Sequence, residues 1–318
     1  MCSFAIIDSG RFDYELLDFG EGYRLERFGQ YIIERPSLAS NGICKFDNKL
    51  WNRIDSSFIP DPSNRQYGKW TFEIGSWQIE LGQIILELRC TPFGHVGFFA
   101  EHVSNWSELT TTIAETLNNR DVVRVLNLFA YTGGATIAAA KAAMLTSTKN
   151  ITTKTTPIIA QFMKESQKRV TVTHVDSAGN VINWAKHNVG LSGVFGVRFI
   201  VEDARKFVAR ELRRGNSYDV VILDPPTYGH GNRGESWKFA IDLPLLLSDI
   251  IGLLSEQPAL IILTAHTKEF DPDALSKMLL QAGLPRFLRI KKFQMQIKTK
   301  KGKSLPSGYG VIASIYNL

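Results

Sequence analysis

The sequence predicts an α/β fold in which a small β-rich domain precedes a mostly parallel, Rossmann-like sheet. From about residue 121, apolar runs of strand length alternate with helical stretches, the pattern of a parallel sheet covered on both faces. Before residue 95, short aromatic and β-branched runs are separated by Gly, Pro and Asn, which favours strands and hairpins. The predicted domains are therefore residues 1–94 and residues 95–318.

The first domain is expected to be mostly antiparallel. Its predicted strands are 14–18, 24–28, 31–34, 70–74, 77–81 and 84–88. Such a module either supports the second domain or takes part in substrate recognition.

The second domain is expected to contain five parallel strands and a C-terminal antiparallel hairpin. The strands are 122–129, 170–176, 197–203, 218–224 and 260–264, and the hairpin pairs 287–295 with 309–316 across a Lys- and Gly-rich turn. The predicted helices include 135–144, 204–214 and 272–283. Five parallel strands closed by such a hairpin are the arrangement of class I methyltransferases.

The composition is that of a soluble, cytoplasmic, globular protein, with 44% hydrophobic and 21% charged residues. No apolar run approaches the ~18 residues of a membrane span, and the N-terminus lacks the pattern of a signal peptide. Three distant cysteines exclude a disulfide framework, and six scattered histidines predict no metal site. The net charge of +6 allows a polyanionic partner without requiring one.

Polar side chains stand at the ends of the first three predicted strands, where open α/β sheets bind ligands. Asn127 lies near the end of the first strand, Asp176 ends the second and Asp203 ends the third. A carboxylate at Asp176 can accept both hydroxyls of a ribose, and one at Asp203 can accept an exocyclic amine such as that of adenine. The alternative is that each Asp caps the helix that follows it.

The turn after the first strand indicates which nucleoside cofactor fits. Residues 129–134 lack the G-x-G-x-x-G spacing that a dinucleotide requires, and the chain has no P-loop. S-adenosylmethionine carries an adenosine and an amino-acid tail but no phosphate, so it matches. Asp176 follows Gly133 by 43 residues, against about 20 in such units. An insertion at 145–168, either a surface excursion or an RNA-contacting loop, restores the expected spacing.

The most specific feature is the D-P-P-T-Y segment after the fourth strand. Asp224, Pro225, Pro226 and Tyr228 are the predicted catalytic residues. Two prolines fix φ and remove amide donors, so the loop leaves the sheet rigidly with its carbonyls toward the pocket. The ring of Tyr228 offers a face on which a flipped base could stack.

Residues 127–133, 174–177, 202–204 and 223–228 together resemble S-adenosylmethionine-dependent methyltransferases that modify bases of large-subunit ribosomal RNA and carry a D-P-P-K/T-F loop. The resemblance covers roughly 95–318, and 97–102 is similar to a family segment lining the methionine end of the cofactor. The N-terminal β module looks more like an uncharacterised bacterial branch that lacks a PUA domain. The cofactor-binding residues implied are Glu101, His102, Asn127, Phe129, Tyr131, Thr132, Gly133, Asp176, Ser177, Asp203, Ala204 and Asp224.

The resemblance also bears on the reaction. Cytosine-C5 methylation needs a cysteine thiolate, which C5 members of the family carry at the end of strand five, where residues 263–267 here contain none. We therefore predict direct transfer to a nitrogen, with the Asp224 carboxylate and the Pro225 carbonyl as hydrogen-bond acceptors that orient it. His266, at the end of this strand, is either a pocket acid/base or a core histidine.

RNA, and ribosomal RNA in particular, is the expected partner. Residues 285–303 contain eight Lys and Arg and no acidic residue, which indicates either a solvated hairpin edge or a surface for RNA phosphates. Two other functions remain open: a methyltransferase for a small molecule or protein, and a non-catalytic nucleoside-binding or assembly protein that kept the fold.

Overall fold

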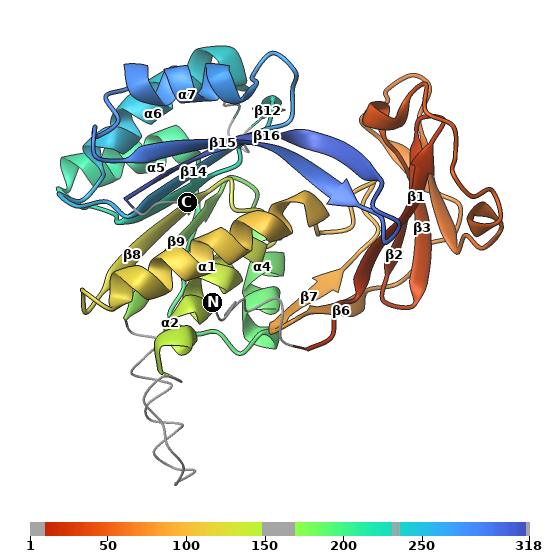
Figure 1. The fold of residues 1–318 in the computed structure, drawn as a ribbon, viewed down its shortest axis with the longest axis horizontal. Helices are drawn as coiled ribbons and strands as arrows, with labels where there is room; N and C mark the ends of the chain where they lie inside the picture. Colours follow the sequence, from red (N-terminus) through yellow and green to blue (C-terminus); the bar gives the residue numbers. More distant parts are fainter. Residues whose placement is uncertain (1–9, 148–168, 231–233, 235, 316–318) are drawn as a thin grey trace, which may run out of the picture. The chain divides into compact units, whose positions relative to one another are not determined.

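The computed structural model of the protein describes residues 10–147, 169–230, 234 and 236–315 (Figure 1). Within these ranges the chain forms two compact units. The N-terminal unit contains residues 10–103 and 295–307, and the sheet unit contains residues 104–294 and 308–315. The sequence places a boundary between 94 and 95, whereas this division groups 95–103 and the hairpin tip 295–307 with the N-terminal strands.

The N-terminal unit is built from short strands. Five form a sheet in the order β1-β2-β3-β4-β5, and β6 pairs with β7 in a separate ribbon. Neighbouring strands run antiparallel except for β3 and β4, which are parallel. The elements are β1 (Tyr14–Gly20), β2 (Tyr23–Phe28), β3 (Tyr31–Pro36), the 3-10 turns η1 (Leu38–Ser40) and η2 (Leu50–Asn52), β4 (Ser56–Pro60), β5 (Gly68–Trp70), β6 (Trp77–Leu81), β7 (Ile84–Leu88) and η3 (Ala100–His102).

The sheet unit contains seven strands in the order β10-β9-β8-β11-β14-β16-β15. The first five run parallel, and β16 runs antiparallel to β14, which confirms the predicted fold. The strands are β8 (Val123–Leu128), β9 (Val170–Asp176), β10 (Arg198–Val201), β11 (Val220–Leu223), β14 (Leu260–Ala265), β15 (Arg289–Lys298) and β16 (Ser304–Ser314), with a small ribbon of β12 (Tyr228–His230) and β13 (Ser236–Lys238).

Helices cover both faces of this sheet, with α1, α2 and α4 on one face and α5, α6 and α7 on the other (Figure 1). Their bounds are Val103–Leu117 (α1), Gly134–Ser147 (α2), Gly179–Leu191 (α4), Ala204–Arg213 (α5), Phe239–Gly252 (α6) and Pro272–Gln281 (α7). In the described ranges, no helix is both long enough and apolar enough to cross a bilayer.

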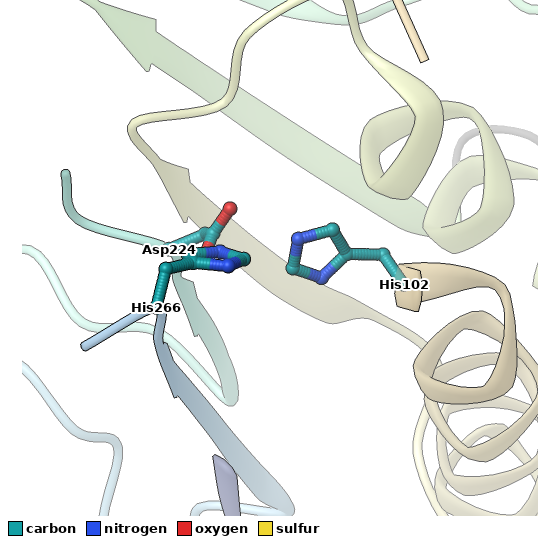
Figure 2. A group of neighbouring side chains, drawn as sticks. All are labelled: His102, Asp224 and His266. Carbon is teal, nitrogen blue, oxygen red and sulfur yellow. The ribbon is translucent and has the colours of Figure 1, made fainter. Parts of the chain in front are cut away.

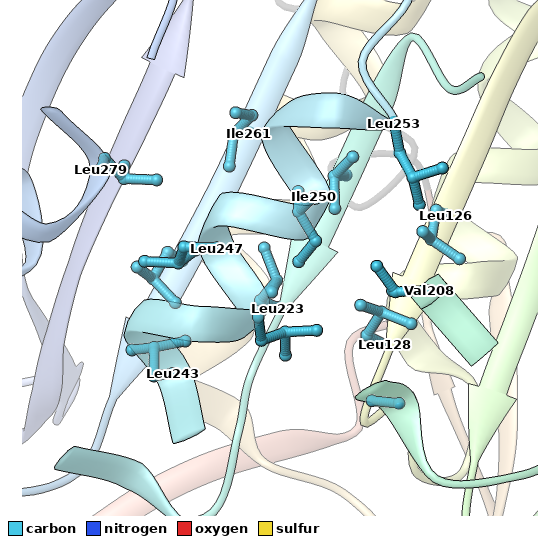
Figure 3. Close-up of a cluster of buried hydrophobic side chains, with 14 of the residues drawn as sticks. Leu126, Leu128, Val208, Leu223, Leu243, Leu247, Ile250, Leu253, Ile261 and Leu279 are labelled. Carbon is cyan, nitrogen blue, oxygen red and sulfur yellow. The ribbon is translucent and has the colours of Figure 1, made fainter. Parts of the chain in front are cut away.

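A hydrophobic cluster fixes the central strands against the helices (Figure 3). Every residue of β11 and β14 is buried, so these strands are continuous apolar runs, as expected of a sheet covered on both sides. Leu243, Leu247 and Ile250 recur at helical spacing on α6 and are buried in the cluster. Burial of each such side chain contributes about 1.5–3 kcal/mol, which stabilises the strand ends that carry the site.

Helix α2 begins directly after the turn that follows β8. Its first residue is Gly134, where a Cβ atom would lie 2.3 Å from the ring of Trp106 on α1, so a larger residue would separate the two helices. The helix continues to Ser147, and residues 145–147, which the sequence assigns to an insertion, are therefore helical. The remainder of the predicted insertion, 148–168, lies outside the described residues.

Candidate functional site

The parallel strands of the sheet unit end at one edge, and the strand order reverses there. Backbone pairing aligns Leu223 of β11 with Leu128 of β8 on one side and with Leu263 of β14 on the other. The chain passes from β8 outward to β9 and β10 and then returns to β11 on the opposite side of β8. Open α/β sheets bind ligands outside the strand ends at such a reversal.

The turn after β8 has an unusual backbone. Phe129 and Tyr131 have φ values of 56° and 51°, and Gly133 has a φ of 97°. Bulky side chains rarely adopt this left-handed region, and each such residue costs about 1–3 kcal/mol unless its surroundings enforce it. The Asp176 carboxylate contributes to that enforcement, because its Oδ2 accepts a 3.0 Å hydrogen bond from the Tyr131 N–H. Backbone strain of this kind is typical of functional sites.

The carboxylate of Asp176 is held at the end of β9, where burial disfavours its ionised form. Its Oδ1 accepts a 2.9 Å hydrogen bond from the N–H of Ala178. Burial raises the pKa of this carboxyl above its usual value, although backbone N–H groups including that of Ser177 oppose the rise. A carboxylate has about four acceptor positions, so the two oxygens can accept further hydrogen bonds, and the contact with ribose hydroxyls stays a prediction.

Asn127 and Thr132 lie inside the fold. The amide of Asn127 donates to the hydroxyl of Thr136 at 3.0 Å, and that hydroxyl contacts Nδ1 of His174 at 2.9 Å. Thr132 is buried, and its carbonyl accepts a 3.0 Å hydrogen bond from the amide of Asn188. These interior contacts fix the position of the turn after β8. The cofactor contacts predicted for Asn127 and Thr132 stay predictions.

Asp203 caps helix α5, as the alternative interpretation of the sequence expects. Its Oδ1 accepts from the N–H groups of Arg205 and Lys206 at 3.0 and 3.2 Å. The Arg205 guanidinium also contacts both oxygens, with Nη2 3.2 Å from Oδ2. The cap begins the helix at Ala204, which is buried. Asp203 is thus oriented by the cap and by an ion pair, and its contact with an adenine amine stays a prediction.

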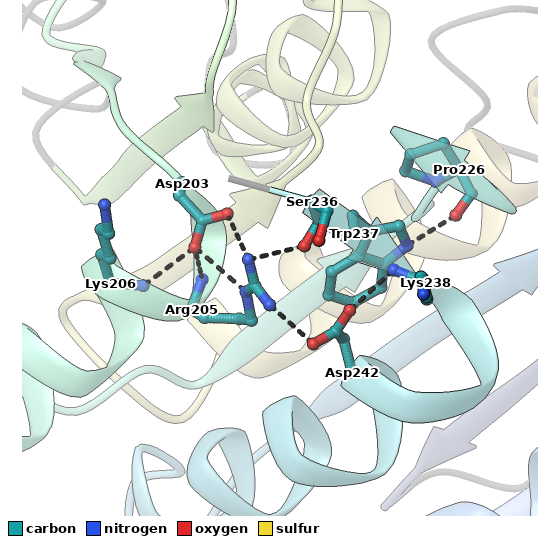
Figure 4. Close-up of polar contacts among 8 residues, drawn as sticks. All are labelled: Asp203, Arg205, Lys206, Pro226, Ser236, Trp237, Lys238 and Asp242. Carbon is teal, nitrogen blue, oxygen red and sulfur yellow. Dashed lines mark hydrogen bonds and ion pairs between the residues drawn. The ribbon is translucent and has the colours of Figure 1, made fainter. Parts of the chain in front are cut away.

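Arg205 extends this network toward the β12–β13 ribbon (Figure 4). Its Nη1 forms a 2.6 Å ion pair with Oδ1 of Asp242 on α6, and its Nη2 donates to the carbonyl of Ser236 at 3.1 Å. The second oxygen of Asp242 accepts from the N–H of Lys238. One guanidinium therefore connects the end of β10 to the ribbon and to the start of α6.

The D-P-P loop is fixed through a residue that the sequence analysis missed. The indole Nε1 of Trp237 donates to the Pro226 carbonyl at 2.6 Å, and its ring packs 4.9 Å from that of Phe129. The carbonyl of Pro226 is therefore engaged by the indole rather than directed at a ligand, and the orienting role predicted for the Pro225 carbonyl stays a prediction. Pro225 is buried and Tyr228 is half exposed, which leaves the Tyr228 ring accessible for stacking. No motif or residue spacing in the sequence indicates that Trp237 contacts the D-P-P loop.

Asp224 and His266 lie side by side at the ends of β11 and β14 (Figure 2). Oδ1 of Asp224 is 3.0 Å from Nε2 of His266 and accepts a 2.6 Å hydrogen bond from the hydroxyl of Thr264. About a third of each side chain of the Asp224–His266 pair is exposed. His266 is therefore an edge residue beside the predicted catalytic carboxylate, and this excludes its interpretation as a core histidine.

Glu101 and His102 belong to the N-terminal unit, where they form the 3-10 turn η3. Glu101 is buried, and its Oε2 has no hydrogen-bond partner among the described residues. A buried carboxylate oxygen without a donor is unusual, and the positive charge of Arg24 in the same unit acts on this carboxylate. The contacts of Glu101 and His102 with the cofactor stay predictions.

Carboxylates neutralise part of the basic segment 285–303. The pairs are Lys291–Glu108, Lys292–Asp273, Lys300–Glu15 and Lys301–Asp47. The last two lie within the N-terminal unit and join the hairpin tip to its strands. Pairing of this kind favours the solvated-edge interpretation over a continuous surface for RNA phosphates.

Comparison with known proteins adds an independent finding. No family model matches the chain. The chain is 32% identical over 164 residues to "Ribosomal RNA large subunit methyltransferase K/L" of Shewanella frigidimarina, which covers 50% of this chain and 19% of that protein. The corresponding protein of Shewanella baltica is 32% identical over 159 residues, covering 49% and 18%. The chain thus spans about a fifth of the length of these relatives.

Solved structures cover much more of the chain. A SAM-dependent methyltransferase from Agrobacterium tumefaciens superposes with a TM-score of 0.79 and 28% identity, over 97% of this chain and 92% of that one. A methyltransferase solved in complex with S-adenosylhomocysteine has a TM-score of 0.65 and 16% identity, over 96% and 76%. The fold is therefore that of class I methyltransferases, and the first likeness supports methyl transfer from S-adenosylmethionine as the reaction.

Proposed function

We propose that this chain is an S-adenosylmethionine-dependent methyltransferase that methylates a base of large-subunit ribosomal RNA directly, without a cysteine nucleophile. The observation that carries the proposal is the shared edge of β8, β9 and β11, where the strained turn, the Asp176 carboxylate and the D-P-P loop meet. The named relatives act on ribosomal RNA, which supports that substrate and, with it, a cytoplasmic site of action.

The residues at this edge fit the cofactor in chemical type. S-adenosylmethionine, when bound, supplies a methyl group on an electrophilic sulfonium. The Asp176 carboxylate would accept the ribose hydroxyls, and the strained backbone at Phe129 and Tyr131 brings the turn close to a ligand that carries no phosphate. Asp224 and the D-P-P loop would position the acceptor, and Tyr228 would hold its ring, so the enzyme contributes mainly orientation.

The distribution of cysteines supports direct transfer. Residues 104–318 contain no cysteine. Cys90 lies in the N-terminal unit, and burial raises the pKa of its thiol, which disfavours the thiolate that nucleophilic catalysis needs. We further propose that the chain belongs with the D-P-P-K/T-F methyltransferases, in the bacterial branch without a PUA domain, because its loop reads D-P-P-T-Y and its N-terminal unit is a sheet of short strands.

Calorimetry tests cofactor binding. Wild-type protein should bind S-adenosylmethionine, and Asp176→Ala should abolish binding because it removes the ribose acceptor and a contact that enforces the strained turn. Asp273→Ala is the matched control, since it removes a carboxylate that is 80% exposed on α7. Absence of wild-type binding at millimolar ligand would favour the non-catalytic alternative.

Methyl mapping tests the substrate. Ribosomal RNA from cells with and without the gene should differ at one base, and the purified enzyme should restore that methyl group to RNA from the deletion strain. Binding to this RNA should weaken as salt rises. Equal modification in both strains, together with affinity that does not depend on salt, would point instead to a small-molecule or protein substrate.

A further inference from the structure

We propose that His266 is a catalytic residue that accepts the proton lost by the acceptor nitrogen, and that the acceptor is therefore a nitrogen that carries hydrogen, as an exocyclic amine does. The inference rests on the proposed function, because it concerns the reaction at the same edge. The inference goes beyond the proposed function in two ways. It names the residue that acts as the base, and it excludes acceptor ring nitrogens that carry no hydrogen.

The geometry of the Asp224–His266 pair carries the proposal (Figure 2). The two residues follow β11 and β14, which are neighbours in the sheet, and their Oδ1 and Nε2 atoms are 3.0 Å apart. His266 is 33% exposed and Asp224 is 29% exposed. The pair thus lies at the edge where the cofactor is proposed to bind, and both side chains are partly exposed.

The hydrogen bonds around Asp224 determine which ring nitrogen is basic. The hydroxyl of Thr264 lies 3.2 Å from the Leu223 carbonyl and 2.6 Å from Oδ1 of Asp224. Its single hydrogen is assigned to the nearer acceptor, Oδ1, which favours the ionised, acceptor-only form of the carboxylate. Nε2 of His266, beside the same oxygen, then carries the other donated hydrogen. Because a neutral imidazole has one N–H, the lone pair resides on Nδ1. A base oriented by a third group is the arrangement that nucleophile activation generally uses.

The proposed step balances without a further reactant. The lone pair of the amine nitrogen forms the new N–CH₃ bond while the S–CH₃ bond breaks and its electrons stay on sulfur. The N–H proton passes to Nδ1 of His266 and later to water, and the Asp224 carboxylate stabilises the imidazolium in the meantime. A ring nitrogen without hydrogen has no proton to give, so a base at this position would serve no purpose.

The test uses the full chain, ribosomal RNA from the deletion strain and radiolabelled S-adenosylmethionine. His266→Ala should lower the single-turnover rate about 10²–10⁴-fold, the usual contribution of a general base, with cofactor affinity unchanged. Added imidazole should restore part of the rate, which a merely structural defect would not allow. His187→Ala, at an exposed histidine of α4, should behave as wild type.

Two results would overturn the proposal while leaving the proposed function intact. One is a His266→Ala rate within about threefold of wild type, well below a general-base contribution. The other is a product nucleoside methylated at a ring nitrogen that has no hydrogen.

If wild-type protein binds the cofactor but methylates no RNA, the proposed substrate fails separately. Nitrogen-15 NMR of the His266 ring then decides. Hydrogen on Nε2 supports the proposal, and hydrogen on Nδ1 at neutral pH overturns it.

Discussion

The indole Nε1 of Trp237 donates a 2.6 Å hydrogen bond to the carbonyl oxygen of Pro226. The same indole ring packs against Phe129 with 4.9 Å between centroids. One side chain therefore connects the turn after β8, where the cofactor is proposed to bind, with the loop that would hold the acceptor. Proline has no N–H through which a loop can be anchored, so its carbonyl is the backbone group available for a hydrogen bond.

Trp237→Phe should impair methyl transfer more than cofactor binding. The variant keeps most of the ring packing but loses the bond to Pro226, which should cost about 0.5–1.5 kcal/mol of stability. Because the loop is then less well positioned, we expect a roughly tenfold lower transfer rate with unchanged affinity for S-adenosylmethionine.

The matched control for this variant is Trp70→Phe. It removes a comparable 2.8 Å hydrogen bond from an indole to the carbonyl of Thr91 in the N-terminal unit. It should lose similar stability in urea titrations and retain the wild-type transfer rate. Full activity of Trp237→Phe would contradict an anchoring role.

Asp203→Ser should separate capping from ligand binding. Serine is a good N-cap, so unfolding by urea should show little loss of stability. The charged acceptor for an adenine amine is lost, and a hydrogen bond to a charged group contributes about 1.5–3 kcal/mol, so cofactor affinity should fall roughly 10–100-fold. Asp271→Ser changes the N-cap of α7 in the same way and should leave affinity intact. Wild-type affinity in Asp203→Ser would show that Asp203 only caps its helix.

Cofactor affinity should weaken in acid at a higher pH than an ordinary aspartate would cause. Burial raises the pKa of Asp176, so its carboxyl takes up a proton while an exposed Asp is still ionised. A protonated carboxyl has lost acceptor capacity for the ribose hydroxyls, and the dissociation constant should therefore rise as the pH falls through this raised pKa. Calorimetry between pH 8 and pH 5 measures the effect, and Asp176→Asn should bind weakly with a flatter profile.

Folding stability should decline below neutral pH because of His174. Burial lowers the pKa of this imidazole to about 3, despite a smaller opposing effect of a backbone hydrogen bond with Tyr131. Between that value and the ordinary pKa of about 6.5, the unfolded chain binds a proton that the folded chain does not. The free energy of unfolding should therefore decrease as pH falls from about 6.5, by up to about 1.4 kcal/mol per pH unit.

Urea titrations at pH 7.5 and pH 5 measure this slope. His174→Gln should flatten it, although the variant will be less stable throughout because the contact with Thr136 is disturbed. His187→Gln, on the exposed surface of α4, should keep the wild-type slope. An unchanged slope in His174→Gln would show that another group carries the pH dependence.

The sheet and the edge at which its parallel strands end could be predicted because their signals are local. Apolar runs such as 220–223 and 260–265 are fully buried in the structure, and near-continuous burial is what a central parallel strand requires. The end of β11 could also be predicted, because two consecutive prolines lack the N–H groups that would continue the hydrogen bonding of the strand. The placement of Asp176 at the sheet edge follows from its position as the last residue of the second predicted strand.

The contacts that orient the site could not be predicted, because they depend on strand order and register. Asp224 and His266 are 42 residues apart in the chain and meet only because β11 pairs with β14 so that Leu223 lies opposite Leu263. In the sequence, Asn127 is a polar residue near the end of a strand. In the structure it is buried and donates a hydrogen bond to Thr136 of α2.

The sequence by itself determined the class of fold, the edge where a ligand would bind and the types of side chain available there. Only the tertiary structure decided which of those side chains are oriented by one another, as Arg205 orients Asp203 and Trp237 holds Pro226. The physical reason is that periodicity records whether a residue is buried, whereas a hydrogen bond between distant residues depends on the three-dimensional placement of whole elements.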